Sequence, residues 1–114
     1  MTLNCKENYR ENKIELEKEL DGLQDELEMN QEEIDHFTID EYYLSIQYKD
    51  YLGKKDVNAA FLESKKIELE HLKNQIKDLK ELRSSIMNSI DDVNCRLAVT
   101  ESFTIEVHFL TLGF

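Results

Sequence analysis

The sequence predicts a mainly all-α protein: an antiparallel coiled-coil helical hairpin with a short middle helix and a C-terminal strand-like tail. Apolar residues recur at alternating steps of three and four along most of the 114 residues, which is the spacing of helices that pack lengthwise against each other. The chain also has no proline and only three glycines, so residues that interrupt helices are nearly absent. We therefore expect residues 1–114 to form a single elongated helical domain.

The first helix is predicted over residues 6–35. Its apolar seam is the set Tyr9, Leu16, Leu20, Leu23, Leu27, Ile34 and Phe37. Lys13 and Asn30 fill the two remaining seam positions. Because a polar residue in a seam restricts the register of the helices at some expense of stability, Asn30 is a candidate register pin, with Arg83 as its counterpart. The alternative is that both side chains lie at the margin of the seam and reach solvent.

A short middle helix is predicted over residues 38–52. Thr38 and Glu41 have the spacing of a capping box, and Phe37 and Tyr42 have the spacing of a hydrophobic staple. Gly53 follows the segment and is suited to the left-handed conformation that ends many helices.

The long helix is predicted over residues 56–99, with Asp56 as its N-cap. Its seam is the set Leu62, Leu69, Leu72, Ile76, Leu79, Ile86, Ile90, Val93 and Leu97. Residues 7–35 carry twelve acidic and three basic side chains, whereas residues 54–83 carry six acidic and eight basic ones. This difference in charge favours an antiparallel hairpin within one chain over a parallel homodimer of long helices.

The tail, residues 103–110, alternates apolar and polar residues with the two-residue period of a strand. A lone strand leaves its backbone groups unpaired, so the tail is expected either to pair with another chain or to be an ordered apolar end of the helix. The far end of the long helix also lacks cover from the shorter first helix. We therefore expect a homodimer, with self-association residues Ile86, Ile90, Val93, Leu97, Phe103, Ile105, Val107 and Phe109.

Four of the five tyrosines, Tyr42, Tyr43, Tyr48 and Tyr51, fall within ten residues. Tyrosine is favoured at interfaces because it combines a rigid apolar ring with a polar tip. Aromatic and aliphatic residues occupy more of this helix than one packing face buries. The segment is thus either a surface for a protein partner or a small core that closes the tip of the hairpin, and different tyrosines can serve each purpose.

An acidic face is predicted along the first helix and is a second candidate partner-binding surface. Its residues are Glu15, Glu19, Asp25, Glu26, Glu28, Glu32 and Glu33. The leading hypothesis is a non-enzymatic interaction or adaptor protein. The alternative is an acidic, nucleic-acid-mimicking inhibitor of a nucleic-acid-binding enzyme, such as a phage anti-defence protein, and a further alternative is a small helical assembly or secretion chaperone.

Other function classes lack support in the sequence. The run Glu32, Glu33, Asp35 and His36 has ligand-type side chains, but consecutive helical positions point in different directions, so no metal site is predicted. No catalytic residue, cofactor, direct nucleic-acid contact or membrane contact is expected either. We expect a cytoplasmic protein, in the host cytoplasm if viral, with Cys5 and Cys95 as free thiols. The alternative is a disulfide between them at one end of the hairpin, but the seam register puts Cys95 on the outer face of the long helix.

Overall fold

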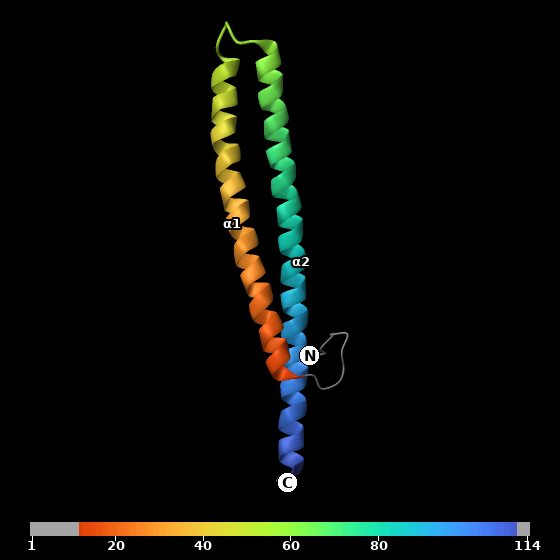
Figure 1. Ribbon diagram of the computed structural model, residues 1–114. Coiled ribbons are helices and arrows are strands. Elements are labelled where there is room, and N and C mark those ends of the chain that lie inside the picture. Colours follow the sequence, from red (N-terminus) through yellow and green to blue (C-terminus); the bar gives the residue numbers. More distant parts are fainter. Residues whose placement is uncertain (1–11, 112–114) are drawn as a thin grey trace. The chain divides into compact units, whose positions relative to one another are not determined.

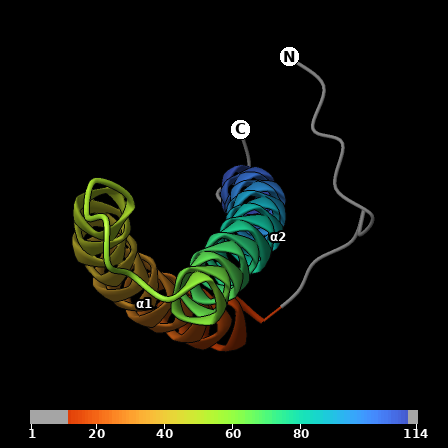
Figure 2. The same cartoon turned by 90° about the horizontal axis from the view of Figure 1, so that it is seen from above.

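The computed structural model describes the backbone of residues 12–111 and the side chains of residues 12–101. Within this range two α-helices, α1 (Lys13–Leu52) and α2 (Ala59–Thr111), are joined by the loop 53–58. Figure 1 shows the helices running in opposite directions from the loop, and Figure 2 looks onto the loop itself. The predicted all-α antiparallel hairpin is therefore confirmed.

The chain divides into two units, each of which pairs a segment of α1 with a segment of α2. We call residues 28–84, which include the loop, the loop unit. The described part of the other, residues 12–27 and 85–111, is the terminal unit. No helix formed by the described residues has a stretch long and apolar enough to cross a membrane.

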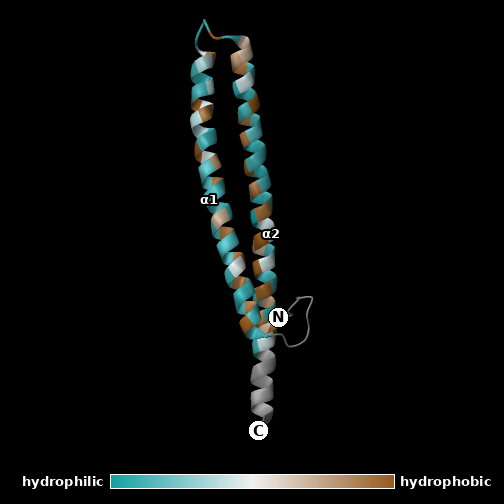
Figure 3. Ribbon diagram, in the orientation of Figure 1, coloured by the Kyte–Doolittle hydropathy of each residue, from teal (hydrophilic) through white to brown (hydrophobic). Residues whose placement is uncertain are grey.

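The core of the loop unit is the predicted seam. Ile34, Leu69 and Ile76 are buried, and apolar residues recur along both helices (Figure 3). Asn30 is also buried, with 4% of its surface exposed, and its Nδ2 donates a hydrogen bond of 3.0 Å to the Leu79 carbonyl. The prediction that Asn30 lies in the seam is confirmed.

Arg83, the predicted counterpart of Asn30, contacts a different residue. Its Nη1 donates a hydrogen bond of 2.9 Å to Oε1 of Gln31. Asn30 and Gln31 are neighbours in α1, and Leu79 and Arg83 are one turn apart in α2, so the two bonds form one polar layer across the seam. A polar layer of this kind stabilises one register over alternatives that would separate its partners.

The terminal unit has its own buried seam. Leu16, Ile86 and Val93 are buried, and so is Thr100. Two ion pairs join the helices here, Lys13 to Glu101 at 3.5 Å and Arg96 to Glu19 at 3.8 Å. The Arg96–Glu19 pair joins an acidic α1 to a basic α2, as the charges of the two helices lead us to expect, whereas the Lys13–Glu101 pair has the opposite sense.

The predicted self-association residues are placed only in part. Ile86 and Val93 are buried, and Ile90 and Leu97 are half-buried, within a single chain. The packing contacts that we expected from a second copy of the chain are therefore made at least partly within one chain. The side chains of Phe103, Ile105, Val107 and Phe109 lie outside the described residues.

The predicted middle helix is wrong as a separate element, because α1 continues without a break to Leu52. Thr38 is not an N-cap: its hydroxyl donates to the Ile34 carbonyl at 2.6 Å, one turn earlier in the same helix, a bond that threonine makes in helix interiors. The middle helix is not separate because the apolar seam of α1 continues through this segment. The steps of three and four continue past the expected break through Glu41, Leu44, Tyr48 and Tyr51, so an unbroken helix keeps these residues on the side that packs against α2.

The helix boundaries also differ from the prediction. Asn12 caps α1, with Oδ1 accepting from the Ile14 backbone N–H at 2.9 Å, whereas the predicted start at residue 6 lies outside the described residues. Asn58, not Asp56, caps α2, because its Oδ1 accepts from the Ala60 N–H at 2.8 Å. Asparagine and aspartate are equally good caps, so residue type alone does not separate these positions.

Gly53 follows the last residue of α1, as predicted, but without the left-handed conformation. The Gly53 N–H bonds to the Asp50 carbonyl at 3.2 Å and the Lys54 N–H to the Tyr51 carbonyl at 3.1 Å. Both bonds span three residues, which is the tighter winding that often ends an α-helix.

The predicted strand at residues 103–110 is wrong, since α2 continues as a helix to Thr111. A helix satisfies its backbone hydrogen bonds within itself, whereas a lone strand would leave them unpaired. The alternation of side chains is therefore outweighed by the backbone, and no strand occurs among residues 12–111.

Cys95 is disulfide-bonded in this structure, so the prediction of a free thiol at this position is wrong. Its side chain is half-buried on α2, not on the fully outer face that the seam register indicated. Cys5 lies outside the described residues.

Candidate functional site

The four clustered tyrosines point to two different sides of α1. Tyr48 and Tyr51 occupy seam positions and are half-buried. The ring of Tyr51 packs edge-to-face on Phe61 of α2, with centroids 5.0 Å apart and planes at 89°. These two aromatic rings close the core next to the loop, so part of the cluster has the structural role that we considered.

Tyr42 and Tyr43 instead face away from the seam. They are 63% and 61% exposed, and their rings meet edge-on at 5.6 Å. Ile39 and Ile46 are exposed on the same side. The four positions follow the i, i+3, i+4, i+7 spacing that places residues on one face of a helix.

Met29, 63% exposed, extends this face toward the start of the loop unit. The helical positions on one line are 29, 32, 36, 39, 43 and 46, again at alternating steps of three and four. We call Met29, Ile39, Tyr42, Tyr43 and Ile46 the outward stripe. A soluble helix normally carries one apolar stripe, whereas α1 carries two here, one on α2 and one on the surface.

Sequence reasoning found Tyr42 and Tyr43 but missed Met29, Ile39 and Ile46. The signal for the missed residues was present, because the outward stripe repeats the seam spacing two positions later along the helix. For Met29 it was hidden by the assumption that a new helix begins at residue 38, because that break would have placed Met29 and Tyr43 on separate helices. Ile39 and Ile46 lie on the same predicted helix as the tyrosines and were not assigned to the surface.

The predicted acidic residues are all exposed, both in the terminal unit (Glu15, Glu19, Asp25 and Glu26) and in the loop unit (Glu28, Glu32 and Glu33). Glu19 pairs with Arg96 of α2. Among the described residues of the loop unit, no ion pair joins α1 to α2. Glu28, Glu32 and Glu33 therefore remain available to another molecule, whereas Asp35, Asp40 and Asp50 contact residues of the same chain.

The run Glu32, Glu33, Asp35 and His36 does not converge. His36 Nε2 lies 3.5 Å from Oδ2 of Asp40, and Asp35 accepts a hydrogen bond of 3.0 Å from Gln31. No group of three histidine, cysteine, aspartate or glutamate side chains is placed to hold a metal ion in the described part of the chain. A shallow groove of about 290 Å³ lies here, lined by Met29, Glu32, Glu33, His36 and Phe37.

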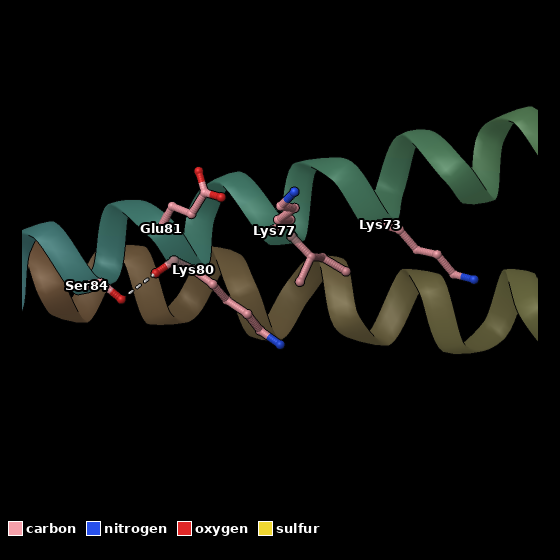
Figure 4. A pocket seen from close by; sticks show the side chains of 6 residues that line it. Lys73, Lys77, Lys80, Glu81 and Ser84 are labelled. Carbon is pink, nitrogen blue, oxygen red and sulfur yellow. Dashed lines mark hydrogen bonds between the residues drawn. The ribbon is translucent and has the colours of Figure 1, made fainter.

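A second shallow groove, of about 430 Å³, lies on α2. Its floor is the buried Ile76, and its walls include Lys73, Lys77 and Lys80 (Figure 4). In Figure 4 the side chain of Ser84 bonds to the Lys80 carbonyl, at 3.3 Å. The groove is open, and three of the six residues that line it are lysines.

Comparison with known proteins identifies no relative. No protein-family model, curated protein or solved structure matches this chain. The function therefore has to be argued from the chain's own surfaces, of which the outward stripe departs most from an ordinary solvated helix.

Proposed function

We propose that the chain is a non-enzymatic protein–protein interaction protein and that the outward stripe binds its partner. The observation that carries the proposal is the exposure of Ile39, Tyr42, Tyr43 and Ile46 on one face of a helix. Contiguous apolar surface rimmed by polar residues is typical of interaction sites. Tyrosine in particular contributes a large contact area with little loss of side-chain entropy, and its hydroxyl group stays hydrated when no partner is bound.

The stripe is not required by the hairpin itself. α1 already packs on α2 through Ile34, Leu44 and Tyr48, which lie on the opposite side. Replacing an exposed side chain away from the core usually changes stability by less than about 0.5 kcal/mol. A binding partner therefore explains the apolar residues at these positions better than folding does.

The experiment places a photo-crosslinking amino acid at position 43 of the full chain, in cells that express it. The expected result is a crosslink to one defined protein that disappears when Ile39→Glu is also present. The matched control is Ile67→Glu, since Ile67 is equally exposed, at 57% against 55% for Ile39, but stands alone on α2. Loss of the crosslink in both variants, or its persistence in both, would contradict the proposal.

The acidic-inhibitor function remains the second candidate, favoured by the exposed acidic side chains of α1. An acidic inhibitor would give a different experimental result from a protein that binds through the outward stripe. Reversing Glu28, Glu32 and Glu33 to lysine would abolish binding, and binding would weaken steeply with added salt. Binding that survives Ile39→Glu but not this charge reversal would favour the inhibitor over the stripe.

Self-association is also part of the proposal. With Ile86 and Val93 already buried, the contact would depend on the apolar residues beyond residue 101. Sedimentation equilibrium of the chain with and without residues 100–114 tests this: a dimer that becomes a monomer supports it, and a monomer in both cases contradicts it.

A further inference from the structure

We infer that the occupant of the outward stripe is a single amphipathic helix of another protein, with lysine or arginine residues on both sides of its apolar face. This inference rests on the proposed function, because it names the chemistry of the partner at the same surface. It is carried by the geometry of the stripe and by the charges that border it.

The stripe has the form of a second coiled-coil seam. Positions 29, 32, 36, 39, 43 and 46 alternate in steps of three and four, as the inner seam of α1 does, and four of the six are Met, Ile or Tyr. A surface with this repeat fits another helix lying lengthwise, because the side chains of a second helix enter the spaces between its residues. From Met29 to Ile46 the seam extends about 26 Å, so the partner needs a helix of about five turns.

A shallow groove lies beside the first half of this seam. It is lined by Met29, by Glu32 and His36 at the two polar seam positions, and by Glu33 and Phe37. An apolar side chain of a partner helix would occupy it, with Met29 and Phe37 as walls. Glu32 and Glu33 at its rim would favour a basic neighbour for that side chain.

Acidic residues border the seam on both sides. Glu28 and Asp35 lie along one edge of the stripe, and Glu33 and Asp40 lie along the other. No lysine or arginine occurs between Glu28 and Tyr48. In coiled coils the residues beside the seam select the partner by charge, so these edges favour a basic helix and disfavour an acidic one.

A second copy of this chain does not fit these requirements. Two outward stripes in contact would bring the acidic edges of two α1 helices together. The lysine-bearing helix α2 has on its own outer face a line of positions on which Ile67 is the single exposed apolar residue, followed by His71, Asn74, Asp78 and Glu81, so it offers no apolar stripe in return. The occupant is therefore a helix of a different protein.

The test uses three fluorescent peptides, each three heptads long. The basic peptide has leucine at the two seam positions and lysine at the flanking positions, the acidic peptide has glutamate in place of lysine, and the scrambled peptide has the composition of the basic one without its period. Fluorescence anisotropy with the full chain measures each affinity at physiological salt. We expect the basic peptide to bind, the scrambled peptide to bind at least about tenfold more weakly, and the acidic peptide not to bind.

Variants of the chain complete the test. Ile39→Glu is expected to weaken the basic peptide by about tenfold, whereas the matched Ile67→Glu leaves it unchanged. Reversing Glu28, Glu33, Asp35 and Asp40 to lysine should transfer binding from the basic to the acidic peptide. Equal binding of the basic and scrambled peptides, equal effects of the two glutamate variants, or no transfer after charge reversal would each overturn the inference. If position 43 still crosslinks to a protein while no peptide binds, the occupant's chemistry is wrong but the proposed function stands; if the crosslink is also absent, both fail.

Discussion

Replacing Asn30 with leucine tests whether the polar layer is there for register rather than for stability. Asn30 is buried in the seam of the loop unit. Its Nδ2 bonds to the Leu79 carbonyl, but its Oδ1 is buried without a hydrogen-bond partner among the described residues. The Leu79 carbonyl lies within α2, where it accepts the helical bond from the residue four positions later, so removing Asn30 leaves no carbonyl unpaired.

The expected change is a gain in stability. Loss of the Asn30–Leu79 bond removes about 1 kcal/mol, while release of the unpaired Oδ1 returns about 2 kcal/mol. A buried leucine adds about 2 kcal/mol of apolar burial, from which about 1 kcal/mol is lost in fitting a larger side chain into the seam. The free energy of unfolding should therefore rise by about 2 kcal/mol, which for a chain of this length raises Tm by about 8 °C.

Thermal and urea unfolding followed by circular dichroism measure this change. Asn74→Leu is the matched control, because Asn74 is exposed on α2 and the same substitution there should leave Tm nearly unchanged. Sedimentation equilibrium checks the second expectation, that Asn30→Leu populates other registers or association states. A lower Tm for Asn30→Leu than for the natural chain would refute the reasoning, since it would mean that Oδ1 is satisfied or that the asparagine stabilises the seam.

Three further predictions follow from the fold. Thr38→Ala should change the unfolding free energy by less than about 0.5 kcal/mol, whereas Asn58→Ala should lower it by about 1 kcal/mol; equal losses would indicate that Thr38 begins a helix. Tyr51→Ala should destabilise by about 1.5 kcal/mol through lost packing of its half-buried ring on the opposite helix, while Tyr43→Ala should have little effect on Tm, and the reverse order would contradict their placement. Deleting residues 102–111 should lower the helical signal in circular dichroism, and an unchanged signal would argue against the helical end of α2.

The seam was predictable from the sequence because its signal is redundant. Leu16, Ile34, Leu69, Ile76 and Val93 were all assigned to it and are all buried. Each belongs to a long repeat, so a wrong assignment at one position leaves the assignments of the other positions unchanged. The antiparallel arrangement was predicted from a different signal, the unlike charges of residues 7–35 and 54–83, together with the short segment between them that lets the chain double back.

The local signals were weaker, because a few residues fit more than one structure. Thr38 and Glu41 have the spacing of a capping box, but a threonine hydroxyl satisfies itself equally on the Ile34 carbonyl inside a helix. The alternation at residues 103–110 likewise describes side chains only, whereas the outcome was decided by backbone hydrogen bonds. In both places a short pattern of side chains did not determine the backbone conformation.

The sequence predicted a partner-binding surface in this segment, but not which residues form it. Four tyrosines in ten residues indicated an interface, and the sequence also indicated that one face could not bury them all. The side that each tyrosine faces depends on its position in the three-and-four repeat of α1. Because a new helix was assumed to begin at residue 38, the repeat before that residue was not used to place the tyrosines. Once α1 is continuous, Tyr48 and Tyr51 fall in the seam, and Tyr42 and Tyr43 fall outside it.

The same continuity explains why the outward stripe and the inner seam coexist on one helix. Between residues 39 and 51 the apolar and aromatic residues alternate between the two sides, with Leu44, Tyr48 and Tyr51 inward and Ile39, Tyr42, Tyr43 and Ile46 outward. A helix that is apolar on two sides is stable in water only if the second side is small or carries polar groups. Tyrosine hydroxyls and the bordering carboxylates meet that condition. The stripe is thus suited to a partner that binds and leaves, and less to a permanent interface, which would be more apolar.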